Sequence, residues 1–272
     1  MWSKVKTRLI SAIVLVAILL LVLFYTPADV FAGLVSILTL LVMYELTKVF
    51  QLSGKKSMVI TNYIFAVVFM GLQYFLHHAL YFPAIILYIM TLMTIAVLNN
   101  KKVKFSDVCS SILLVFYSVA ILMHLTFIRR MEGGIGLIFM ALIGAYITDT
   151  GAYFTGLTLG KHKLIPAVSP NKTVEGAVGG VVWSVAGFIV YGIIMTKLGY
   201  SVNYIYLVIL SVLCAVAAQL GDLSASVMKR SYEVKDFGNL IPGHGGIVDR
   251  VDSLMFVAPV VYYFITYLPV IK

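Results

Sequence analysis

Apolar runs of about twenty residues recur along the whole chain and are separated by short polar segments. Hydrophobic residues make up 61% of the 272 residues and charged residues only 11%, against roughly 25% charged in soluble domains. A helix needs about 20 mostly apolar residues to cross a bilayer. The pattern therefore predicts an all-α polytopic membrane protein with about nine transmembrane helices. The expected spans lie near 9–26, 30–47, 58–76, 80–98, 108–127, 135–157, 176–197, 202–221 and 249–269.

The basic residues indicate the orientation of these spans. If the N-terminus is cytoplasmic, all but four of the chain's 20 lysine and arginine residues lie on the cytoplasmic side; the exceptions are Arg129, Arg130, Lys197 and Lys272. Because cytoplasmic loops of membrane proteins are rich in basic residues, this favours nine spans with the N-terminus in the cytoplasm and the C-terminus outside. Basic loops that face anionic lipid also explain the net charge of +9 without a nucleic-acid partner.

The chain divides into two parts by its chemistry. Residues 1–134 form about five generic spans, in which Glu45 and the histidines 77, 78 and 124 are interpreted as interfacial or packing residues. Residues 135–272 form about four spans with polar groups inside or beside them, and with cytoplasmic loops expected at 158–175 and 222–248. The polar groups make this second part the candidate functional region of an integral membrane protein, and the orientation places both loops in the cytoplasm.

Asp149 is the most unusual residue of the sixth expected span. A carboxylate inside an apolar run costs a few kcal/mol unless it is paired or faces water, so it is a candidate functional residue. The alternative is a protonated or lysine-paired structural acid. Lys172 and Glu175 follow at the mouth of the next span, where they form a candidate substrate-facing pair. The glycines of both spans have a structural interpretation, since small residues allow close helix packing in membranes.

The hydrophilic stretch 222–252 holds five of the chain's eleven acidic residues. If the eighth helix continues past Gly221, the spacing of i, i+4, i+7 and i+11 places one set of polar residues on a single face. This set is Asp222, Ser226, Lys229 and Glu233. Asp249 and Asp252 lie three residues apart at the start of the last span and so near each other on its surface. The pattern predicts that Asp222 and Asp249 meet where one helix leaves the membrane and the next enters it.

Carboxylates without thiolates or a histidine cluster are hard oxygen ligands of the kind that Mg²⁺ prefers. We therefore expect Asp222 and Asp249 to be metal ligands. The alternative is that they pair with Lys229, Arg230 or Lys235. The segment 242–246 and the N-terminus of the last helix offer main-chain N–H groups for a phosphate. His244 within it adds little, because a lone histidine in a glycine turn is usually structural.

These residues resemble the signature of the phosphatidate cytidylyltransferases, also called CDP-diacylglycerol synthases. The matching positions are Ser226, Met228, Lys229, Arg230, Lys235, Asp236, Gly238, Ile241, Pro242, His244, Gly245, Gly246, Ile247, Asp249, Arg250, Val251 and Asp252. The segments 149–154 and 169–176 resemble the same family, with Asn171 where many members carry a second lysine. The resemblance covers about 140–255 and implies a Mg²⁺-dependent reaction of CTP with phosphatidate, giving CDP-diacylglycerol and pyrophosphate. It also suggests a homodimer.

The resemblance implies a role for each candidate residue. Asp222 and Asp249 would hold the cation, or a pair of cations of which the second is divalent or monovalent, such as K⁺. The basic groups Lys229, Arg230 and Lys235 would grip the triphosphate, and Lys172 would orient a phosphate. Asp149, Glu175 and Asp252 would position the ligands. The remaining substrate-binding candidates are Ser226, His244, Gly245, Gly246 and Arg250.

Two other functions share these features. A CTP-dependent lipid kinase of the dolichol or phytol kinase type resembles this family in its nucleotide region, but it transfers the γ-phosphoryl group to an alcohol and releases CDP. A transporter of an anionic substrate would use the acidic residues for cation coupling. The position of most charges at a cytoplasmic span end, rather than in mid-membrane, argues against the transporter.

Overall fold

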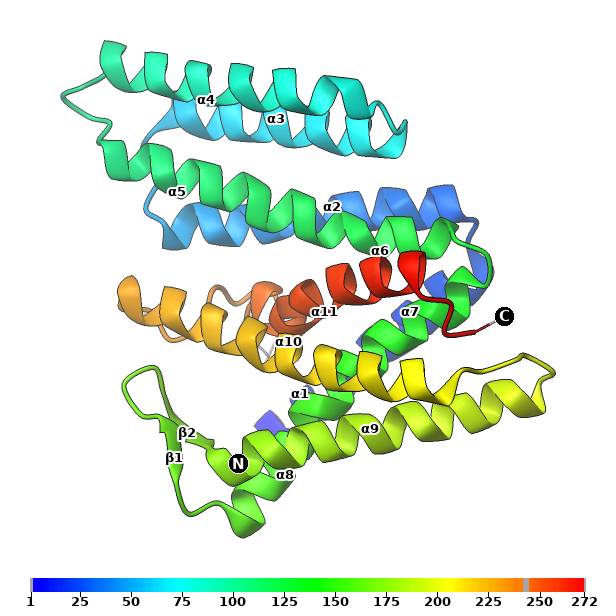
Figure 1. Cartoon of the computed structure of the whole chain (residues 1–272). Coiled ribbons are helices and arrows are strands. Elements are labelled where there is room, and N and C mark those ends of the chain that lie inside the picture. The colour runs from blue at the N-terminus through cyan, green and yellow to red at the C-terminus, as the bar shows by residue number, and fades with distance from the viewer. Residues whose placement is uncertain (1, 242–244, 272) are drawn as a thin grey trace. The chain divides into compact units, whose positions relative to one another are not determined.

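The computed structural model describes residues 2–241 and 245–271 of the chain, and within them it leaves aside the side chains of residues 2–12, 15 and 78. His244, one of the predicted substrate-binding residues, therefore lies outside the described residues. Most of the described chain is helical (Figure 1). Each expected span coincides with a helical segment, because the long apolar runs satisfy their main-chain hydrogen bonds internally as helices.

Seven helical stretches of the described chain are long and apolar enough to cross a bilayer. They are α2 (Ala28–Val49), α3 (Lys56–Tyr74), α4 (Tyr81–Leu98), the composite stretches Phe105–Arg130 and Gly134–Leu159, α9 (Val174–Lys197) and α10 (Tyr204–Ser231). Helix α1 (Trp2–Tyr25) contributes the shorter apolar stretch Val16–Tyr25, and α11 (Val248–Tyr267) carries three charged residues in its first turns. An all-α polytopic membrane protein is supported, while the span number of nine and the orientation stay predictions.

Both composite stretches contain a π-helical segment. The first runs through α5 (Phe105–Val115), the π-turn η2 (Phe116–Ala120) and α6 (Ile121–Arg130). The second runs through α7 (Gly134–Leu142), the π-turn η3 (Ile143–Ile147) and α8 (Thr148–Leu159). A short 3₁₀ helix, η1 (His78–Leu80), precedes α4.

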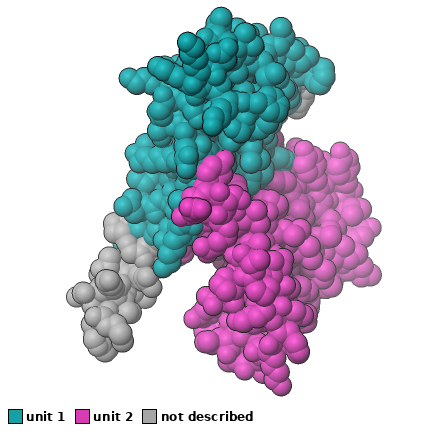
Figure 2. Space-filling view, turned by 90° about the vertical axis from the view of Figure 1, so that its left-hand side faces the viewer, with its two compact units in different colours: residues 1–126, 234–248 teal, residues 127–233, 249–272 magenta. Residues whose placement is uncertain are grey.

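The chain forms two compact units (Figure 2). Unit 1 comprises residues 1–126 and 234–248, and unit 2 comprises residues 127–233 and 249–272. In unit 1 the helices α2 to α5 pack on one another around an apolar core. A buried polar contact lies within it, where the Tyr88 hydroxyl contacts Asn62 Oδ1 and the Ser111 carbonyl oxygen, both at 2.9 Å.

In unit 2 the closest helix packing is between α8 and α9. Glycines allow this approach: a Cβ atom added at Gly151 would overlap the Trp183 side chain, and one added at Gly179 would overlap Thr155. The interpretation of these glycines as packing residues is confirmed. Close packing of α8 and α9 holds Asp149 and the start of α9 in fixed positions relative to each other.

The structure departs from the sequence prediction at two places. The expected loop 158–175 contains an antiparallel hairpin of β1 (Lys163–Ile165) and β2 (Ser169–Thr173). Strands this short carry no readable periodicity. Helix α10 does continue past Gly221, as the shared face required, but it ends at Ser231. Glu233 has a positive φ of 55°, so its predicted place on that helical face is wrong.

Candidate active site

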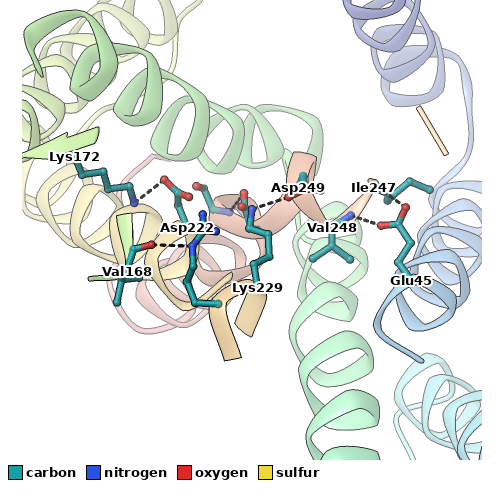
Figure 3. A network of polar contacts seen from close by, with 11 residues as sticks. Glu45, Val168, Lys172, Asp222, Lys229, Ile247, Val248 and Asp249 are labelled. Atoms are coloured by element: carbon teal, nitrogen blue, oxygen red, sulfur yellow. Dashed lines mark hydrogen bonds and ion pairs between the residues drawn. The ribbon is translucent and has the colours of Figure 1, made fainter. Parts of the chain in front are cut away.

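Asp222 and Lys172 form an ion pair in unit 2. Asp222 lies on α10 and Lys172 on β2, and Lys172 Nζ is 2.6 Å from Asp222 Oδ2 (Figure 3). About a third of the Asp222 side chain and a quarter of the Lys172 side chain are exposed. Two of the predicted site residues are thus brought together, each as the other's partner.

Lys229 and Asp249 form a second, more buried pair. Lys229 Nζ donates to Asp249 Oδ1 at 2.7 Å, and these side chains are only 13% and 5% exposed. The alternative interpretation, that the carboxylates pair with nearby basic groups, therefore holds for Asp249 in this structure. Arg230 follows on α10, and its Nε donates to the Val168 carbonyl oxygen at 3.4 Å. Arg230 thus contacts the tip of the β1–β2 hairpin.

Close packing of α10 and α11 brings further carboxylates to Asp222. A Cβ atom added at Gly221 would lie 2.5 Å from the Asp252 carbonyl oxygen, so only glycine lets the two helices approach this closely. Asp252 on α11 and Asp149 on α8 both lie near enough to Asp222 for the three charges to interact. The positive charge of Lys172 attracts the carboxylate of Asp149, and that of Lys229 attracts the carboxylate of Asp252. Together with Asp249, the partner of Lys229, these side chains form what we call the carboxylate cluster of unit 2: Asp149, Asp222, Asp249, Asp252, Lys172 and Lys229.

The π-turn η3 directly precedes α8, whose second residue is Asp149. A π-turn inserts one extra residue into a helix and changes the direction of the side chains that follow it, and such turns often occur at functional sites. At this turn the Tyr146 hydroxyl donates to the Arg250 carbonyl oxygen at 3.2 Å. This hydrogen bond joins the first turn of α11 to the span that carries Asp149.

A cavity of about 470 Å³ lies beside the carboxylate cluster. Asp149, Lys172 and Asp222 contribute to its polar wall, and α8, α9, α10 and the hairpin supply the rest. Its lining also includes Tyr153, Asn171 and Thr173 from the family-like segments, and two residues that the sequence had not singled out, Lys163 and Gln219. Lys163 is the most informative of these because it adds a second lysine from the hairpin to the same cavity. Antiparallel pairing, with Lys163 opposite Thr173, explains how it comes close to Lys172.

Other predicted site residues lie elsewhere. Glu175 does not line this cavity: its Oε2 accepts from the N–H groups of Lys161 at 3.0 Å and His162 at 3.2 Å. It stabilises the turn before β1, contrary to its predicted substrate-facing position. Lys235 is exposed in the part of the chain that belongs to unit 1, Ser226 is buried on α10, and Arg250 is exposed on α11.

At the N-terminus of the last helix, where the sequence predicts a phosphate site, two main-chain N–H groups already have an acceptor in this structure. The N–H groups of Ile247 and Val248 donate to the two carboxylate oxygens of Glu45, at 3.0 and 2.9 Å (Figure 3). Glu45 had been interpreted as an interfacial or packing residue. Its partners lie about two hundred residues away in sequence, so no local pattern could reveal this role.

The donor set of the carboxylate cluster suits a hard cation. Carboxylate oxygens are typical Mg²⁺ ligands, and Lys172 and Lys229 already place positive charge beside Asp222 and Asp249. Within the described chain, no three histidine, cysteine, aspartate or glutamate side chains stand close enough to hold a metal ion together. The ligand type therefore suits Mg²⁺, but in this structure Asp222 and Asp249 are each paired with a lysine and are not arranged around a metal ion.

Comparison with known proteins identifies close relatives of this chain. The sequence profile of the cytidylyltransferase family matches residues 6–268. The chain is 40% identical over 176 residues to a phosphatidate cytidylyltransferase of Bacillus subtilis, which covers 64% of each protein. It is 41% identical over 168 residues to the enzyme of that name in Staphylococcus saprophyticus, covering 62% of this chain and 63% of the relative. The matched part thus spans less than two thirds of each of these relatives.

Proposed function

Because the chain belongs to the cytidylyltransferase family, we propose that it transfers the cytidylyl group of CTP to phosphatidate, forming CDP-diacylglycerol and pyrophosphate. The printed name of its relatives, phosphatidate cytidylyltransferase, supports this substrate pair. The observation that carries the proposal is the carboxylate cluster beside the 470 Å³ cavity. Neighbouring lysines can bind the phosphate groups of a polyphosphate, and neighbouring aspartates can bind its cation.

The reaction needs alignment and charge neutralisation more than acid–base catalysis. An oxygen of the phosphatidate phosphate is already anionic near neutral pH and attacks the α-phosphorus of CTP in line. The bond from the α-phosphorus to the bridging oxygen breaks, and pyrophosphate leaves with the bonding electrons. Lys229 and Arg230 bind the departing phosphates, and Lys172 orients a phosphate from the hairpin. Preorganised positive charge of this kind is a large contribution to catalysis.

In this proposal Asp222 and Asp249 hold Mg²⁺, with Asp149 and Asp252 positioning the ligands. When bound, the cation supplies charge neutralisation at the phosphates. The lysines that pair with these aspartates in the structure then turn to the phosphates. Each lysine thereby exchanges one anionic partner for another, and no charge of the cluster is left uncompensated. A second cation, divalent or monovalent such as K⁺, is part of the same proposal.

The proposed enzyme is an integral protein of the cell (inner) membrane with nine spans, a cytoplasmic N-terminus and a homodimeric assembly. Catalysis belongs to residues 135–272. The basic residues support the orientation, since all but four of the 20 lie on one side in this arrangement. CTP is a cytoplasmic nucleotide, so the carboxylate cluster must face the cytoplasm.

A product assay on the purified protein in detergent tests the reaction. With CTP, Mg²⁺ and phosphatidate, we expect pyrophosphate release that depends on phosphatidate. Release of CDP in place of pyrophosphate would identify a lipid kinase. Absence of any CTP turnover, in protein shown to be folded, would contradict the enzyme proposal altogether.

Cysteine labelling tests the orientation. In a variant with Cys109 and Cys214 replaced, Ser57→Cys and Ser169→Cys should react with a membrane-impermeant thiol reagent only from the cytoplasmic side. Tyr200→Cys should react only from the outside. Reaction of Ser169→Cys only from outside would place the hairpin in the wrong compartment for CTP.

A further inference from the structure

Glu45 is a fully buried acid near the end of α2, with 1% of its surface exposed. A buried carboxylate is costly unless hydrogen bonds compensate it. Here both oxygens accept main-chain hydrogen bonds, Oε1 from Ile247 and Oε2 from Val248. All three residues belong to unit 1. The buried charge of Glu45 is therefore stabilised only when residues 245–248 adopt this conformation, and Glu45 in turn stabilises that conformation.

Val248 is the first residue of helix α11, and Ile247 is the capping position before it. The first N–H groups of a helix have no acceptor within the helix, and they are usually capped by a Ser, Thr, Asp or Asn side chain at the preceding position. That position is Ile247, whose side chain cannot accept a hydrogen bond. Glu45 supplies the missing acceptor from a different helix. Its negative charge also suits the positive end of the helix dipole.

Two glycines of the family-like signature are explained by the same carboxylate. A Cβ atom added at Gly238 would lie 2.5 Å from Glu45 Oε1, and one added at Gly246 would lie 2.6 Å from Oε2. Neither glycine needs a positive φ, so close approach to Glu45 is the reason for glycine there. Two hydrogen bonds and burial keep the carboxylate from moving aside.

Asp249 directly follows Val248 in the chain. We infer that Glu45 is a positioning residue for the proposed reaction: it fixes residues 245–248 and thereby the first turn of α11, from which Asp249 extends. The kinetic part of this inference rests on the proposed function, but the contact itself does not. Glu45 touches no substrate in this account and acts only through the main chain of α11.

Glu45→Gln is the primary test. Its side chain keeps the size of glutamate, but the amide nitrogen would face a main-chain N–H, so one of the two hydrogen bonds is lost. We expect main-chain amide exchange in a peptide covering residues 245–250 to become at least about tenfold faster, with peptides of α10 within about twofold of the wild type. We also expect kcat to fall at least about tenfold and the KM for CTP to change less than about threefold.

Asp107→Asn is the matched control. Asp107 is another buried acid of unit 1 at a helix start, where it accepts from the Lys104 N–H at 2.7 Å. Its loss should not accelerate exchange at 245–250. If Glu45→Gln leaves this exchange unchanged, or accelerates it equally throughout α2 to α5, the positioning role is contradicted. If the segment loosens and kcat stays as in the wild type, the role in the reaction is contradicted while the contact stands.

A double-mutant cycle tests the packing independently and needs no activity. Gly246→Ala should accelerate exchange at 245–250 in the wild-type background but add less than about threefold in a Glu45→Ala background, because the clashing carboxylate is gone. Gly54→Ala, where a Cβ atom meets nothing within 4 Å, should change neither background. If Gly246→Ala accelerates exchange at 245–250 by the same factor in the wild-type and the Glu45→Ala backgrounds, the inference is overturned. Should Glu45→Ala not fold, Glu45→Asp, which keeps the charge on a shorter side chain, takes its place.

Discussion

The two buried acids Glu45 and Asp107 of unit 1 and the carboxylate cluster of unit 2 have different surroundings. In unit 1, Glu45 and Asp107 are buried and hydrogen-bonded to the main chain at helix starts, and Asp107 also pairs with Lys55 at 2.6 Å. In unit 2, Asp149, Asp222 and Asp252 lie within reach of one another, and two of the three line a cavity. Like charges in proximity disfavour each other. Binding of cations would relieve this repulsion, so the arrangement suits a cation site.

The difference separates two uses of a carboxylate in a membrane protein. Main-chain N–H groups are fixed partners, so an acid that accepts from them stabilises the fold. A lysine side chain on a hairpin is a movable partner, and about a third of Asp222 remains exposed beside it. We therefore expect substitutions in unit 2 to affect catalysis, and substitutions of the unit 1 acids to act on structure first.

The largest effect is expected for Asp222→Asn. In the proposed reaction Asp222 would hold the cation that neutralises the phosphates. Loss of this carboxylate should cost several kcal/mol, so pyrophosphate release should fall below about a tenth of the wild-type rate at every Mg²⁺ concentration. The amide still fits its surroundings, and the melting temperature should stay close to that of the wild type. Asp249→Asn should behave alike. Turnover above a tenth in either variant would remove that residue from the cation site.

Lys229→Ala should have the next largest effect. The side chain bridges α10 to Asp249, and in the proposal it binds the departing phosphates. We expect kcat/KM for CTP to drop at least about tenfold, equivalent to about 1.4 kcal/mol of transition-state stabilisation. Lys229→Arg retains the charge and should keep more activity than alanine. Equal losses in both variants would indicate a packing role for the side chain.

Lys163→Ala tests the cavity itself. Lys163 lines it from β1, whereas Lys161 lies two residues earlier and does not. We expect Lys163→Ala to raise the KM for CTP or for phosphatidate about threefold to tenfold, and Lys161→Ala to leave both constants within about twofold. Equal behaviour of the two variants would mean that only the general basicity of the hairpin matters.

Asp107→Asn should have the smallest effect on activity. It removes the ion pair with Lys55, while the amide oxygen can still accept from the Lys104 N–H, and this loss should cost about 1–3 kcal/mol of stability. The melting temperature should fall, while kcat/KM of the folded protein stays within about twofold. A tenfold loss of kcat/KM in folded Asp107→Asn would erase the contrast between the two units.

Hydrophobic patterning predicted the positions of the helices because each apolar run is long and satisfies its main chain internally. Helical periodicity alone also predicted that Asp222 and Lys229 lie on one face of α10. Glu233 does not lie on this face, because α10 ends at Ser231 and Glu233 itself has a positive φ. Lys163 was missed because three- and five-residue strands leave no periodic signal.

Contacts between distant segments could not be predicted in the same way. The sequence showed that lysines and carboxylates were near one another in general, but not which of them pair: Lys172 and Asp222 are fifty positions apart and meet only because β2 reaches α10. Glu45 resembled a packing residue because its acceptor role depends on main-chain N–H groups from the other end of the chain. Gly238 and Gly246 belong to the family-like signature, and the close approach of the Glu45 carboxylate explains why both are glycine.

The fate of labelled CTP tests the central claim most directly. Purified wild-type protein and the variants Asp222→Asn and Asp107→Asn are given CTP labelled at the α- or the γ-phosphate, with phosphatidate and Mg²⁺, and the lipid is extracted. For cytidylyl transfer we expect α-label and no γ-label in the lipid from the wild type and from Asp107→Asn, and neither label from Asp222→Asn. Appearance of γ-label in the lipid, or of α-label with Asp222→Asn at the wild-type rate, would contradict it.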